Sequence, residues 1–188
     1  GVNSRDILFD SDQEAPCPML TDFGFARLLP QELSSQLHHD YLMLTPHYVA
    51  PELKEQQASA ASVDVYGLAV TFFEMLAAQL PPERQPGQPL PPLSTVNPAV
   101  GDLFDELLTK ATAIDPLQRY QSVADFLEAI QQVRQQEVAE LISVAEHYVE
   151  LGKSDPGIAL AMIEDIFEVY PNHPDALRLR GRIQLKQH

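Results

Sequence analysis

The pattern of apolar residues predicts one helix that is buried on every side. Residues 63–78 read VDVYGLAVTFFEMLAA, and the clear polar breaks are Asp64, Thr71 and Glu74. A surface helix has a single apolar stripe, whereas a helix that is apolar all round lies inside the protein. The chain is therefore expected to fold around a central helix at 63–78.

Two short apolar runs near the N-terminus have an extended character. They lie at 6–9 and 19–21, and the polar, proline-containing stretch 10–18 separates them. Short apolar runs on either side of a turn-forming stretch are typical of a β-hairpin.

The segments after the central helix are also predicted to be mainly helical. Residues 79–93 are rich in proline and glycine, which excludes a regular helix, and we expect a surface loop there. Asn97 with Pro98 predicts the N-cap and first turn of a helix over 99–112. Ser122, three residues before Asp125, predicts the start of a further helix around 123–134.

From about residue 135 onward, the sequence changes to shorter helical segments with small residues. Helical stretches at 136–152, 156–170 and 171–185 are separated by Gly152 and by proline-containing turns. Helices alternating with short turns indicate an α-hairpin repeat. We therefore predict two domains, 1–134 and 135–188.

Composition and charge restrict the function. The 188 residues carry a net charge of −15 with 12 Lys and Arg, so nucleic acid and anionic membrane surfaces are unfavourable partners. No apolar run has the roughly 20 residues that span a bilayer, and the first residues do not have the basic and then apolar pattern of a leader, so secretion is not expected. The single cysteine, Cys17, is expected to be an inert loop thiol, which fits a reducing, cytoplasmic location.

Four motifs in order resemble the C-terminal lobe of protein kinases, over residues 1–133. These are Asp22-Phe23-Gly24, the stretch LTPHYVAPEL at 44–53, the central helix at 61–76, and ATAIDPLQRYQSVADFLEAI at 111–130. The resemblance implies a mainly α fold, namely a kinase C-lobe with a small β-hairpin. The α-hairpin segment would follow it.

The resemblance also implies roles for individual residues. Asp22 of the Asp-Phe-Gly triplet, which ends at Gly24, would bind Mg²⁺ with ATP. Glu52 and Arg119 would form a buried ion pair that ties the activation segment to the lobe, and Asp64 would support the catalytic loop. In this family a threonine at the position of Thr45 contacts the catalytic residues and favours Ser/Thr specificity. Candidate phosphorylation sites are Ser34, Ser35 and Thr45.

The catalytic loop of the family, HRDLKPxN, precedes the strand that matches Ile7 and Leu8. Alignment without gaps places Asp6 at the Mg²⁺-binding asparagine, Asn3 at the lysine and Gly1 at the catalytic aspartate. Aspartate can bind Mg²⁺ as asparagine does, but glycine cannot accept a proton. Either Gly1 is native and the protein is a pseudokinase, or Gly1 is an artificial start. The asparagine in place of lysine favours the pseudokinase.

The sequence contains neither the glycine-rich loop nor the lysine strand with which kinases cover ATP. We therefore expect this chain to be an inactive fragment that needs no cofactor, whereas an intact parent would use Mg²⁺ and ATP. The parent would be a Ser/Thr protein kinase that acts on protein substrates. The alternative is a pseudokinase scaffold that binds protein partners.

The tail, 159–185, resembles a tetratricopeptide repeat (TPR). Small or packing residues match at Ala159, Ile163, Ile166, Ala176 and Gly181, and Pro171 matches the closing proline. About one and a half repeat units are present, where such arrays usually need three. The array would continue beyond residue 188, or the piece would pack on the lobe. A helical extension without a ligand groove is the other interpretation.

Overall fold

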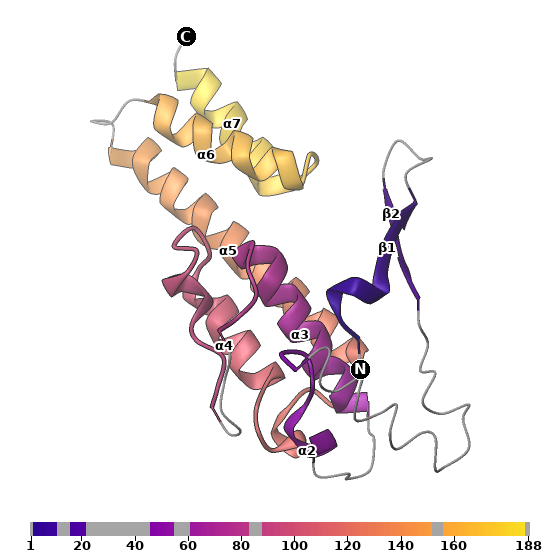
Figure 1. Ribbon diagram of the computed structural model, residues 1–188. Helices are drawn as coiled ribbons and strands as arrows, with labels where there is room; N and C mark the ends of the chain where they lie inside the picture. The colour runs from indigo at the N-terminus through magenta and orange to yellow at the C-terminus, as the bar shows by residue number, and fades with distance from the viewer. Residues whose placement is uncertain are drawn as a thin grey trace. The chain divides into compact units, whose positions relative to one another are not determined.

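The computed structural model describes residues 2–10, 16–21, 46–54, 61–82, 88–151 and 156–186. They fall into an N-terminal unit, 1–130, and a C-terminal unit, 131–188. The fold is mainly helical with one small sheet, as predicted (Figure 1). In chain order the elements are η1 (Ser4–Asp6), β1 (Ile7–Asp10), β2 (Cys17–Leu20), α2 (Pro51–Lys54), α3 (Ala61–Ala77), η3 (Leu93–Thr95), α4 (Asp102–Ala111), η4 (Pro116–Gln118), α5 (Val123–Leu151), α6 (Pro156–Val169) and α7 (Pro174–Lys186).

The predicted hairpin is present as an antiparallel pair of strands. Ile7 of β1 lies opposite Leu20 of β2, and Asp10 lies opposite Cys17. The second strand begins earlier than the apolar pattern indicated, so Cys17 is an exposed strand residue and not a loop thiol. Pro18 is tolerated in this strand because both strands of a two-stranded sheet are edge strands.

The helix α3 is the centre of the N-terminal unit, in agreement with its all-round apolar pattern. Val65, Ala69, Val70 and Phe73 are almost completely buried. Figure 1 shows α4 beside it, and the rings of Phe72 and Phe104 lie 5.8 Å apart between the two helices. Each large apolar side chain buried in this way contributes about 1.5–3 kcal/mol to stability.

The helix α4 begins three residues later than predicted. The Asn97 side chain makes a turn by accepting a hydrogen bond from Ala99 N–H at 3.2 Å, and its amide donates to the Leu76 carbonyl near the end of α3 at 2.9 Å. Gly101 is the N-cap, and Asp102 opens the helix. Asn97 therefore caps a carbonyl near the end of α3 and is not the N-cap of α4.

The predicted helix break near residue 135 is wrong, because α5 is continuous from Val123 to Leu151. Its start agrees with the sequence, since Ser122 Oγ accepts a hydrogen bond from Asp125 N–H at 3.1 Å. Residues 131–137 contain no glycine or proline, so nothing in the backbone interrupts the helix. Within the described ranges, no helix is both long enough and apolar enough to cross a membrane.

The C-terminal unit has its own apolar core. Ala145, Ala159 and Ala176 are fully buried, and such small side chains let the helices approach closely. Around them lie the larger core residues Val138, Ile142, Ile163, Ile166, Leu179 and Ile183. Gly181 is different, since a Cβ added there would meet nothing within 4 Å. Close packing therefore does not explain this glycine.

Candidate functional site

The segment that leads into β1 holds Asp6 in a fixed orientation. Asn3 caps the short helix η1, and its Oδ1 accepts a hydrogen bond from Arg5 N–H at 2.9 Å. Asn3 also donates to Asp6 Oδ2, from its side-chain amide at 2.6 Å and from its main-chain N–H at 3.2 Å. Both side chains are buried. The structure therefore brings together the two residues that were predicted to match the lysine and the metal-binding asparagine of the kinase catalytic loop.

The main chain of Asp6 is joined to the end of the hairpin. Its carbonyl accepts hydrogen bonds from Thr21 N–H at 2.7 Å and from Thr21 Oγ1 at 3.2 Å. Thr21 immediately precedes Asp22 in the sequence. The hairpin thus returns the chain from Asp6 to the start of the Asp-Phe-Gly triplet.

Gly67 of α3 makes room for the N-terminal segment, which the sequence analysis did not recognise. A Cβ at this position would lie 2.3 Å from the Val2 carbonyl oxygen, far inside a normal contact. A glycine within a helix costs about 1 kcal/mol relative to alanine, so a mid-helix glycine is itself a sign of close backbone packing.

Tyr48 joins three segments of the N-terminal unit, and the sequence analysis assigned it no role. Its hydroxyl donates to Glu74 Oε2 of α3 at 2.5 Å, and lies 2.9 Å from Ser4 Oγ in η1. Burial, followed by the hydrogen bond to Glu74, raises the pKa of Tyr48 to about 12. The tyrosine therefore stays neutral and connects the segment before α2 with η1.

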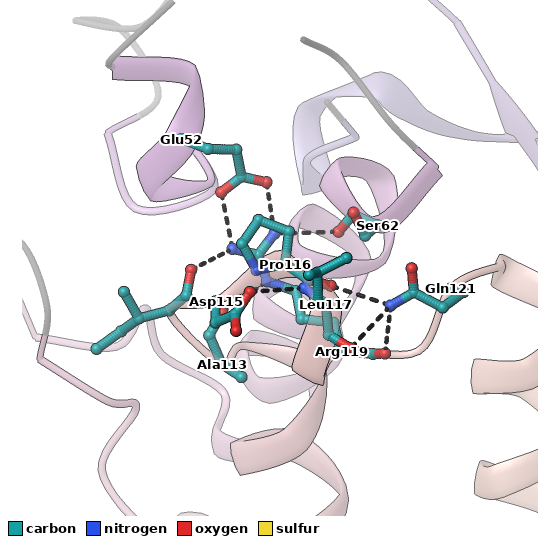
Figure 2. A network of polar contacts seen from close by, with 9 residues as sticks. Glu52, Ser62, Ala113, Asp115, Pro116, Leu117, Arg119 and Gln121 are labelled. Atoms are coloured by element: carbon teal, nitrogen blue, oxygen red, sulfur yellow. Dashed lines mark hydrogen bonds and ion pairs between the residues drawn. The ribbon is translucent and has the colours of Figure 1, made fainter. Parts of the chain in front are cut away.

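Glu52 and Arg119 form a buried, bidentate ion pair (Figure 2). Arg119 Nη1 donates to Glu52 Oε1 and Nη2 to Oε2, both at 2.7 Å. Further donor groups of Arg119 bind main-chain carbonyls, and its guanidinium lies 5.0 Å from the Tyr66 ring centroid. These carbonyls belong to Ala113 at 2.6 Å, Ile114 at 3.1 Å and Ser62 at 3.3 Å. One side chain thus joins α2, the start of α3 and the loop before η4.

The loop that presents Arg119 is held by its own polar side chains. Asp115 Oδ1 accepts a hydrogen bond from Leu117 N–H at 2.9 Å and caps η4. Gln121 Nε2 donates to the carbonyls of Pro116 at 3.0 Å and Arg119 at 2.8 Å (Figure 2). This arrangement fixes the backbone of Arg119 next to Glu52.

The other predicted site residues are either exposed or lie outside the described part of the chain. Asp64 lies in the first turn of α3 and its side chain is exposed in the structure. Within the described residues, no three His, Cys, Asp or Glu side chains cluster in a way that would hold a metal ion. The predicted site residues outside the described part of the chain are Gly1, Asp22, Gly24, Ser34, Ser35 and Thr45.

A buried Arg–Glu pair that is bonded to the start of a central apolar helix, with a short hairpin earlier in the chain, fits the expected C-terminal lobe of a kinase. The protein kinase domain family matches residues 2–137. The chain therefore belongs to the protein kinase family.

Two of the similar proteins are serine/threonine-protein kinases of bacteria. The chain is 31% identical to the serine/threonine-protein kinase Pkn1 of Myxococcus xanthus over 199 aligned residues, which cover 97% of this chain and 27% of Pkn1. It is 27% identical to the serine/threonine-protein kinase PrkC of Bacillus subtilis, over 56% of this chain and 17% of PrkC. The chain thus spans about a quarter or less of these relatives. The TPR character of the tail stays a prediction.

Proposed function

We propose that this chain contributes the C-terminal lobe of a Ser/Thr protein kinase that transfers phosphate from ATP to a protein hydroxyl. The observation that carries the proposal is the Asp6 carboxylate, which Asn3 holds in place, while Thr21 binds the main-chain carbonyl of Asp6. Carboxylate oxygens suit Mg²⁺, and Asp6 and Asp22 are the residues that would hold it. When bound, the ion would neutralise charge on the phosphates. The Glu52–Arg119 pair would tie the end of the activation segment to the rest of the lobe.

By itself the chain is proposed to be inactive. Phosphoryl transfer depends on positioning the triphosphate from both sides, and this sequence has neither a glycine-rich loop nor the lysine strand. Titration of the 188-residue chain with Mg·ATP, followed by its melting temperature, should give no saturable shift. Saturation at micromolar ATP would contradict this part of the proposal.

The test of the kinase assignment uses the longest natural form of the protein. With radiolabelled ATP and a generic protein substrate, we expect transfer to serine or threonine. Asp6→Asn restores the residue usual in the family and should retain transfer, whereas Asp6→Ala should lower it at least about 100-fold, since it removes a metal ligand. Equal rates for all three forms would refute a role for Asp6.

A pseudokinase scaffold is the second candidate, and the bond between Asn3 and Asp6 favours it. The family has a lysine at the position of Asn3, and a neutral amide bonded to Asp6 cannot supply a positive charge to a phosphate. Binding of protein partners without any phosphoryl transfer in the longest natural form would support the scaffold. The residues that precede Gly1 bear on the same choice, since an HRD triplet there in a shifted register would favour the enzyme.

A further inference from the structure

The C-terminal unit has a groove between α5 and α7 that the kinase assignment does not use. The cavity is about 450 Å³, which is the size of a site for a small ligand or a few residues of a peptide. Ala139 and Ile142 of α5 provide apolar lining. The charged lining comes from Glu146, Asp175, Arg178 and Arg182.

The helix α7 is unusual in this acidic chain. It has four basic residues and one acidic residue, while the whole chain has a net charge of −15. Among the described helices it is the one in which basic residues outnumber acidic ones. An anionic ligand is therefore attracted to α7 more than to any other described helix.

Two of these arginines face the groove together. Arg178 and Arg182 are four residues apart, which places them on the same side of the helix. Arg178 Nη1 lies 3.0 Å from Asp175 Oδ1, and Arg182 Nη1 lies 3.1 Å from Glu146 Oε1. Both pairs are exposed, and exposed ion pairs contribute little to stability. A stronger anion can exchange for these carboxylates at little cost.

We propose that this groove binds a peptide segment containing phosphoserine or phosphothreonine. A carboxylate ligand would only replace one existing carboxylate partner by another. A phosphate has a charge of about −2 and three acceptor oxygens, so it can bind both guanidinium groups at once. Ala139 and Ile142 would contact an apolar residue next to the phosphorylated one. His173 also lines the groove, and its buried Nδ1 is without a hydrogen-bond partner among the described residues.

The test measures fluorescence anisotropy of the 188-residue chain with degenerate nonapeptides. One library has phosphoserine or phosphothreonine at its centre, a second has the unmodified hydroxyl, and a third has glutamate. We expect the phosphorylated library to bind at least about tenfold more tightly than the other two, because each charge-assisted hydrogen bond to the phosphate strengthens binding by about tenfold or more.

Three variants separate this site from a general effect of charge. Arg182→Gln should weaken binding about tenfold or more. The matched control, Arg180→Gln, removes the same charge from the same helix. Arg180 does not line the groove, since its guanidinium lies 4.6 Å from the Phe167 ring centroid and 4.0 Å from Glu164, so its loss should change affinity less than threefold. Glu146→Gln removes the competing carboxylate and should tighten binding, an effect that a purely structural role of Glu146 would not produce.

The proposal is overturned if the glutamate library binds as tightly as the phosphorylated one. Equal losses in the Arg180 and Arg182 variants would overturn it as well, as would stronger binding to RNA or to anionic vesicles than to the phosphopeptides. Melting temperatures of the variants identify any that fail to fold. If an arginine variant fails to fold, the Glu146 variant provides the test, and unchanged or weaker phosphopeptide binding by Glu146→Gln would overturn the proposal. The measurement needs no ATP and no phosphoryl transfer, so its result is independent of the proposed kinase function.

Discussion

Replacement of Glu52 by glutamine tests how strongly the buried ion pair stabilises the N-terminal unit. The variant keeps the shape of the side chain but leaves the Arg119 charge buried without a counter-charge. Its amide nitrogen would also face a guanidinium N–H where an oxygen now accepts at 2.7 Å. Only 6% of the Glu52 side chain and none of the Arg119 side chain is exposed, so water cannot compensate. Loss of one partner from a buried pair costs about 3–5 kcal/mol.

Hydrogen–deuterium exchange measured by mass spectrometry can assign the loss to this unit. The amides of α3 should lose about 3–5 kcal/mol of protection, while those of α6 and α7 should keep theirs and act as an internal reference. The matched control is Asp175→Asn, which removes a carboxylate from an exposed pair and should cost at most about 1 kcal/mol.

A double-mutant cycle with Arg119→Met isolates the pair itself. The double variant should be less destabilised than the two single variants added together, because it leaves no unpaired charge. It still leaves three main-chain carbonyls without their donor, so it should not reach wild-type stability. A loss below about 1 kcal/mol in the Glu52 variant, or additive losses in the cycle, would refute the reasoning.

Five further substitutions make three tests, two of packing within the units and one of the pH dependence of stability. Gly67→Ala should destabilise the N-terminal unit by about 1–3 kcal/mol in urea unfolding, because its Cβ would meet the backbone of the N-terminal segment. The Cβ of Gly181→Ala would meet nothing, so this variant should stabilise α7 by up to about 1 kcal/mol. A change of the same sign in both variants would contradict the packing at Gly67. The raised pKa of Tyr48 stabilises the folded state below pH 10, and this contribution is lost as the pH rises to about 12. In Tyr48→Phe, the free energy of unfolding should therefore fall less steeply between pH 10 and about 12 than in the wild type. An unchanged pH profile of unfolding would exclude this. Ile163→Ala should lower the stability of the C-terminal unit by about 2–5 kcal/mol, because this side chain is fully buried. Leu185 is 81% exposed, so Leu185→Ala should lower it by less than about 0.5 kcal/mol. Similar melting temperatures for the two variants would contradict the assigned core.

Some features of the fold follow directly from local sequence. The buried helix α3 and the hairpin were predicted from apolar periodicity, because period and burial are properties of a single segment. The start of α5 was predicted from another local signal, Ser122 as the N-terminal cap. The start of α4 was not, because the Asn97 amide binds a carbonyl of another helix, Leu76, and no local pattern contains that partner.

The sequence by itself determined the family, since four motifs in order define the kinase lobe, and it singled out Glu52, Arg119, Asn3 and Asp6 as candidate site residues. Only the tertiary structure decided which partners these residues contact. The hydrogen bonds from Asn3 to Asp6, the contact of Gly67 with the N-terminal backbone, and the Arg178–Arg182 groove depend on where distant segments meet in space. The physical reason is that local periodicity and capping act over a few residues, whereas hydrogen-bond partners and backbone clearance are set by packing between elements far apart in the chain.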